Sequence, residues 1–236
     1  MFSKKIISGL VIGFAALIPI SSLSYSSNEQ VIAQEKSSVP TSIDKAKIVQ
    51  WIKQQGKEKE YFLDKLTYKL VNLDEDNDLE LVASATGGTH LGNFFIFDKQ
   101  QENFKLIVEK KWHVTSESLN NLVSSDKSPY ETKNKKILFE TIEQTGGSGV
   151  HEENTHLWYL DNGKFVEAWE GNLKTLTSFQ NINSATIATY HLDEDRLFYF
   201  SNSYKHPEED TNTPPEVTQK TFIFRFDGAK FVEETR

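Results

Sequence analysis

The sequence predicts a mostly β protein built from antiparallel repeats, for three reasons. Aromatic residues make up 12% of the 236 residues, and Phe and Tyr dominate them, which favours strands. Beyond residue 60 the chain consists of short runs of alternating apolar and polar residues separated by turns. This pattern recurs with a period of about 60 residues, which is typical of propeller blades. We therefore expect a small propeller, a partial propeller or a curled antiparallel sheet, preceded by one amphipathic helix.

The composition argues against several classes of function. The formal net charge is −8 and the chain has no basic stripe, so nucleic acid is not an expected partner. The absence of cysteine excludes disulfides, thiol catalysis, zinc–thiolate sites and a lipid-attachment cysteine. An acidic surface instead attracts cations.

The first residues predict a secreted, extracellular protein. Two lysines precede an apolar run over residues 6–20, and a Ser-rich stretch follows, which is the order of a secretory signal peptide. The run is short for a membrane span and contains Pro19. We expect a signal peptide over residues 1–24 and a polar linker over residues 25–41, so that the chain meets the membrane only through its signal peptide.

One amphipathic helix is expected over residues 43–55. Apolar residues recur there at helical spacing: Ile43, Ala46, Val49 and Ile52. Thr41 and Asp44 form a candidate capping box, and Gly56 is a natural end. We expect the apolar stripe to pack on the sheet that follows.

Three repeat units are expected within a β-repeat domain over residues 42–236. They cover approximately residues 60–111, 128–172 and 184–236. Each unit reads as a strand, a polar loop, an aromatic strand, a turn and a further strand. Asp-Gly and Asp-Asn-Gly sequences after the aromatic strands of the last two units are strong hairpin signals.

The sharpest chemical signal is an acidic turn between two alternating runs. Its side-chain oxygens fall at every second position: Asn72, Asp74, Asp76, Asp78 and Glu80. Hard cations such as Ca²⁺ take about six to eight oxygen ligands, which closely spaced carboxylates on a tight turn can supply. An EF-hand is excluded, because its loop needs glutamate where this chain has Ala85. We expect these residues to form one calcium site.

This turn resembles the calcium loops of FG-GAP and VCBS repeat proteins, which have the form Asp-x-Asp-x-Asp-Gly-x-x-Asp/Glu between two strands. The family's aromatic strand followed by Asp-Gly-Lys-Phe is also similar to residues 158–165 and 222–231. The resemblance implies four side-chain ligands and one backbone carbonyl ligand: Asn72, Asp74, Asp76 and Glu80, then Asp78. The chain departs from the pattern where Asn77 replaces the glycine and Asn72 replaces the first acid, which lowers the ligand charge. The resemblance also implies an extracellular protein with a binding or structural role.

Three histidines lie in the loops before the aromatic strands: His90, His151 and His206. If the units stack around one axis, these imidazoles share one end of the molecule and could hold a transition metal. A metal-dependent hydrolase that uses these histidines is therefore one alternative function. Residues 206–217, rich in proline and acids, are expected to form a long exposed loop. A protein inhibitor or adhesin segment that makes contact through this loop is the other alternative.

The function expected from these features is a secreted, non-catalytic, calcium-stabilised β-repeat domain. Its expected partner is an extracellular or envelope protein or a glycan. No catalytic residue is assigned, since the many Asp and Glu residues show no spacing that selects a catalytic pair.

Overall fold

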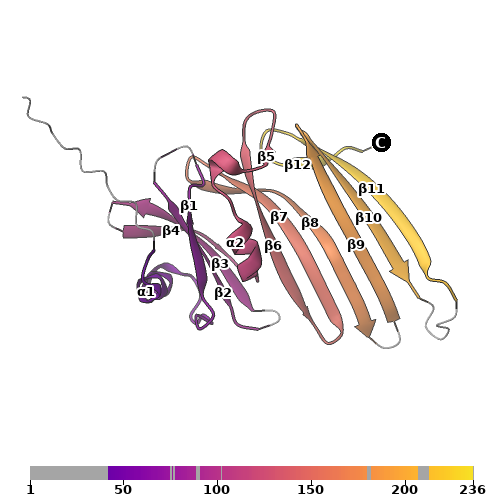
Figure 1. Cartoon of the computed structure of the whole chain (residues 1–236), viewed down its shortest axis with the longest axis horizontal. Coiled ribbons are helices and arrows are strands. Elements are labelled where there is room, and N and C mark those ends of the chain that lie inside the picture. Colours follow the sequence, from indigo (N-terminus) through magenta and orange to yellow (C-terminus); the bar gives the residue numbers. More distant parts are fainter. Residues whose placement is uncertain are drawn as a thin grey trace, which may run out of the picture. The chain divides into compact units, whose positions relative to one another are not determined.

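The computed structural model describes residues 42–235 apart from 75, 77, 89, 90, 102, 180, 181 and 207–212. This part of the chain is mostly β, with two antiparallel sheets and two α-helices (Figure 1). The expected signal peptide over residues 1–24 and linker over residues 25–41 lie outside the described residues. Within the described part, no helix is both long enough and apolar enough to cross a membrane.

The amphipathic helix expected from the sequence is present as α1, Lys45–Gln55. Asp44 is its N-cap, and the carboxylate accepts the N–H of the second helical residue at 2.9 Å. Ile48 and Ile52 are buried against the first sheet, whereas Ala46 of the expected stripe is exposed. The buried face of α1 is therefore centred on Ile48 and Ile52 and leaves out Ala46, because isoleucine removes more apolar area from water than alanine does.

The first sheet is a four-stranded meander in the order β1-β2-β3-β4. Its strands cover Thr67–Val71, Glu80–Thr86, Gly92–Gln100 and Asn103–Lys110. They all fall inside the expected unit over residues 60–111. Both faces of β2 are covered, because Leu81 belongs to the core beneath α1 and Val82 belongs to the core on the opposite face.

The second sheet has eight strands that follow one another from β5 to β12 (Figure 1). They cover Tyr130–Glu131, Ile137–Gly147, Val150–Asp161, Lys164–Phe179, Ile182–Asp193, Arg196–Lys205, Glu216–Phe226 and Phe231–Glu233. The first four of these strands overlap the expected unit over residues 128–172, and the last four overlap the expected unit over residues 184–236.

The described strands form no closed propeller, so that expectation is wrong. Strand β8 is 16 residues long and continues to Phe179, past the expected end of its unit at residue 172. Its last part, Lys174–Phe179, pairs with the first part of β9. The two units therefore join edge to edge, because an extended strand edge presents unpaired backbone groups that the next strand can satisfy.

The second sheet curls toward itself. Tyr159 on β7 donates its hydroxyl hydrogen to the carbonyl of Ala229, in the turn between β11 and β12, at 3.2 Å. Tyr190 on β9 donates to Glu140 on β6 at 2.9 Å. These bonds join parts of the sheet that are not neighbouring strands. The sheet is therefore curled, which is one of the three architectures expected from the sequence.

A shared core joins the two sheets. The ring of Phe94 on β3 lies 5.9 Å from that of Trp158 on β7, and Phe139 on β6 lies 5.1 Å from Trp158. The helix α2, Ser116–Asn121, covers the same core with Leu119. A short 3-10 helix over Ser125–Lys127 then leads into β5.

Trp158→Ala is expected to lower the free energy of unfolding by about 3–5 kcal/mol, because it leaves a cavity in place of a fully buried ring. Urea denaturation followed by circular dichroism measures this loss. Val232→Ala is the control on an exposed apolar residue and should change the free energy by less than about 0.5 kcal/mol. Equal losses in both variants would contradict the assigned core.

Candidate metal centre

The acidic turn connects β1 to β2, and the pairing of Val71 with Glu80 closes it. Its carboxylates shape the backbone locally. The Asp76 N–H donates to Asp74 Oδ1 at 3.0 Å, and the Asp78 N–H donates to Asp76 Oδ1 at 2.7 Å. Asp residues bond readily to the backbone two positions on, which explains why this sequence forms a turn here.

Glu80 is the only one of the five expected ligands that is buried, with 1% of its surface exposed. Its Oε2 accepts the N–H of Leu73 at 2.6 Å, while its Oε1 has no hydrogen-bond donor among the described residues. Burial, together with repulsion by the Asp74 and Asp76 charges, raises the pKa of Glu80 to about 7. A buried carboxylate oxygen without a partner costs about 1–3 kcal/mol or more, so it calls for a proton or a cation.

Three carboxylates meet at this point. One oxygen each of Asp74, Asp76 and Glu80 lies within 4.8 Å of the others. Burial also raises the pKa of Asp74, with repulsion from Asp76 and Asp98. Calcium–oxygen distances are about 2.3–2.6 Å, so one calcium ion could touch all three oxygens.

The other two expected ligands have protein partners. Asn72 donates from Nδ2 to the carbonyl of Asp76 at 2.7 Å, and its Oδ1 accepts from Ser125 Oγ at 2.7 Å. The Asp78 carboxylate pairs with Lys99 Nζ at 2.6 Å. No sequence pattern pointed to Ser125 or Lys99, because both are brought to the turn only by the tertiary fold.

A pocket of about 630 Å³ opens beside the turn. Asp74 and Asp76 line one wall, and Ser125 lies beside them. The turn between β5 and β6, with Lys135, and the end of β7, with Asp161, form most of the rest. Asp74 and Asp76 of the carboxylate cluster therefore face open space that solvent or a ligand can enter.

A second cluster lies around His156, which is 1% exposed. Its Nδ1 is 2.8 Å from Glu167 Oε1 and its Nε2 is 3.1 Å from Glu143 Oε2. Lys110 Nζ lies 3.0 Å from the other oxygen of Glu167. The imidazole stacks on Trp112 with ring centroids 3.9 Å apart.

This arrangement favours the doubly protonated imidazolium, because both ring nitrogens face carboxylates and both then donate. Burial lowers the pKa of His156, but the hydrogen bonds to Glu143 and Glu167 outweigh it and the net pKa is raised. His156, Glu167 and Glu170 also lie close enough together to hold a metal ion. Lys110 and the imidazolium already supply two positive charges to this cluster, so we interpret it as an ion-pair network. No sequence spacing singles out His156 as a functional residue, because its partners Glu143 and Glu167 lie on other strands.

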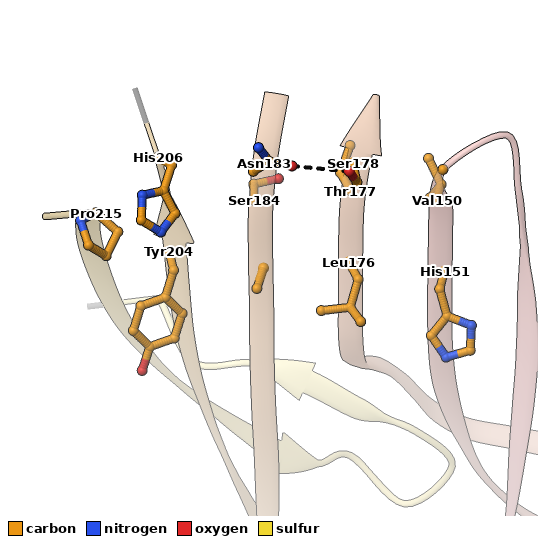
Figure 2. A pocket seen from close by; sticks show the side chains of 12 residues that line it. Val150, His151, Leu176, Thr177, Ser178, Asn183, Ser184, Tyr204, His206 and Pro215 are labelled. Atoms are coloured by element: carbon orange, nitrogen blue, oxygen red, sulfur yellow. Dashed lines mark hydrogen bonds between the residues drawn. The ribbon is translucent and has the colours of Figure 1, made fainter. Parts of the chain in front are cut away.

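The histidines expected at one end of the molecule do not converge where the structure describes them. His151 and His206 both line a pocket of about 590 Å³, but they lie on opposite sides of it (Figure 2). Strands β8 and β9 separate them, which corresponds to about 14 Å at the usual strand spacing. The alternative of a metal-dependent hydrolase, which needs these histidines to converge, therefore gains no support from His151 and His206, and His90 lies outside the described residues.

Much of the loop expected over residues 206–217 is also outside the described residues, which resume at Thr213 after residues 207–212.

Comparison of the chain with protein-family models, curated proteins and solved structures found no match. The resemblance to FG-GAP and VCBS calcium loops therefore stays a prediction from the sequence.

The His156 network is expected to make stability depend on pH. The raised pKa of His156 gives a contribution that is complete below its ordinary value of 6.5 and is lost as pH rises through the folded value. Burial works to raise the pKa of Glu167, but its bonds to His156 and Lys110 leave it lowered. Its contribution is therefore complete above the ordinary value of 4.5 and lost as pH falls through the folded value.

His156→Gln should accordingly lose most stability relative to wild type between about pH 4.5 and 6.5, and less at alkaline pH. Urea denaturation at several pH values measures the difference. His191→Gln, at an exposed position of β9, is the control. A difference between wild type and His156→Gln that stays constant across pH would contradict the assigned protonation.

Proposed function

We propose that this chain is a secreted, non-catalytic β domain that binds one calcium ion in the turn between Asn72 and Glu80. The observation that carries the proposal is the buried Glu80 Oε1, which lacks a hydrogen-bond donor and lies beside Asp74 and Asp76. Secretion is proposed from the signal-peptide pattern of residues 1–24. The proposed partner is an extracellular or envelope protein or a glycan.

The donor set favours calcium over other metals. Three carboxylates supply only oxygen, and the carbonyl of Asp78 is a further oxygen donor on the same turn. Oxygen-rich sites suit calcium, magnesium and manganese, whereas transition metals favour imidazole or thiolate. Magnesium requires a near-ideal octahedron, while calcium accepts the irregular geometry that a turn with one buried and two surface carboxylates provides.

The ion would stabilise more than the turn itself. Ser125, just before the second sheet, bonds to this turn three times. Its N–H donates to the carbonyl of Asn72 at 3.0 Å, and its hydroxyl contacts Asn72 Oδ1 at 2.7 Å and the Asp74 carbonyl at 3.1 Å. A calcium ion that fixes the backbone of the turn therefore also fixes the segment that leads into β5.

Calcium is expected to raise the melting temperature. A dissociation constant of about 0.1 mM, typical of extracellular calcium modules, and about 10 mM calcium give a stabilisation of about 2.7 kcal/mol. For a domain of this size, that corresponds to roughly 5–10 °C. Thermal melts in calcium, in magnesium and in chelator test this, with magnesium expected to give the smaller shift. An unchanged melt together with no heat in calcium calorimetry would refute the calcium site.

Glu80→Gln is expected to separate the effect of the buried charge on stability from the effect of calcium binding. In chelator at pH 8 the variant should be at least as stable as wild type, because it removes a buried charge and its amide oxygen can still accept the Leu73 N–H. In calcium its melting temperature should rise far less than that of wild type, because one ion ligand has lost its charge.

Asp78→Asn is the matched control in the same turn. It removes the ion pair with Lys99 but leaves the three clustered carboxylates in place. Its calcium-induced shift should therefore match that of wild type, even if its baseline stability is lower. A full calcium shift in Glu80→Gln, or none in Asp78→Asn, would contradict the assigned ligands.

A further inference from the structure

The pocket beside the acidic turn is lined by two carboxylates of the turn and by two lysines, one of which is paired with Asp161. Asp74 and Asp76 line the side that carries the proposed calcium site. Lys135 and Lys136, in the turn between β5 and β6, line the other. The volume of about 630 Å³ falls within the usual range for small-molecule sites.

The proposed ion would have free coordination positions on the pocket side. Calcium takes about six to eight oxygen ligands, and the clustered side chains of Asp74, Asp76 and Glu80 supply only part of that number. The side chain of Asn72 is engaged by Ser125, and that of Asp78 is engaged by Lys99. Because Asp74 and Asp76 line the pocket, a ligand in the pocket would lie next to an ion held by their carboxylates.

The lysine wall is held in place by its own turn. The N–H of Thr132 donates to the carbonyl of Lys136 at 3.0 Å, and the N–H of Lys135 donates to the carbonyl of Thr132 at 2.8 Å. Lys136 Nζ lies 2.7 Å from Asp161 and 5.3 Å from the centroid of the Tyr159 ring. Lys136 is therefore oriented by the protein, whereas the neighbouring Lys135 is exposed at the pocket edge.

We propose that this pocket binds the oxyanion of a hydroxylated small molecule, an acidic sugar, between the calcium ion and Lys135. The inference rests on the proposed calcium site. A carboxylate or phosphate oxygen would complete the coordination of the ion, and Lys135 would offset the remaining charge. Asn134 and Asn162 also line the pocket and offer amide groups to the ligand hydroxyls, and Asn162 Nδ2 also contacts Asp161 Oδ1 at 3.3 Å. The shared chemistry is an oxyanion on a sugar, which a uronate and a sugar phosphate both provide.

Calcium calorimetry with and without sugars tests this inference. Sodium glucuronate and glucose 1-phosphate are the charged probes, and glucose is the neutral probe. Binding that is shared between ion and anion is reciprocal, so at least one charged probe should tighten the calcium dissociation constant by about fivefold or more. Titrations without protein correct for direct binding of calcium to the probes.

Two lysine variants identify the contact. Lys135→Ala should bind calcium as wild type does but lose the tightening by the charged probe. Lys133→Ala, at an exposed position of the same turn but outside the pocket lining, should keep it. Melting curves establish that both variants are folded.

The outcomes separate the two proposals. Absence of calcium binding to wild type would overturn both the calcium site and the anion site. Calcium binding that neither charged probe tightens would overturn the anion site alone. Equal tightening by glucose, or undiminished tightening in Lys135→Ala, would also overturn it. Tightening by only one charged probe supports the inference and identifies the oxyanion as carboxylate or phosphate.

Discussion

The burial of the Glu80 carboxylate is the constraint on which the acidic turn depends. Glu80 begins β2, a strand whose alternate residues are committed to cores on both faces of the first sheet. A slip by one residue would release Glu80 but would also exchange Leu81 and Val82 between those cores. The strand register therefore holds a carboxylate inside the protein, where its Oε2 has one donor and its Oε1 has none.

The burial of Glu80 beside two other carboxylates in the first sheet also bears on the segment that leads into the second sheet. The carboxylates of Asp74, Asp76 and Glu80 repel one another at close range, which contributes to the raised pKa of Glu80. A proton on these oxygens, or a cation bound to them as proposed, would relieve the repulsion. Because Ser125 is bonded to the backbone of this turn, relief of that repulsion also orders the path into the second sheet.

The sequence pattern predicted those parts of the fold that are set by residues close together in the chain. Alternating residues indicated the strands, and the acidic turn was located between two of them. The pairing of β8 with β9 was missed, although Lys174-Thr175-Leu176-Thr177 continues the alternation beyond the expected unit. Whether a strand edge stays open or takes a partner depends on what the rest of the chain leaves uncovered. Ser125, Lys99 and Lys135 reach the candidate site through tertiary structure alone, so no sequence spacing could identify them.

Charge compensation distinguishes the two acidic clusters found among the described residues. Around His156, the imidazole bonds to Glu143 and Glu167, and Lys110 pairs with the second oxygen of Glu167, so the protein supplies the countercharge. At the turn, Lys99 neutralises Asp78, but the described residues supply no donor to Glu80 Oε1. Similar carboxylate spacing therefore has two different consequences. The carboxylates bonded to His156 have positively charged partners within the protein. At the turn, a proton or a cation would have to be added to give Glu80 Oε1 a partner. Asp74 and Asp76 beside it line a pocket that is also lined by Lys135.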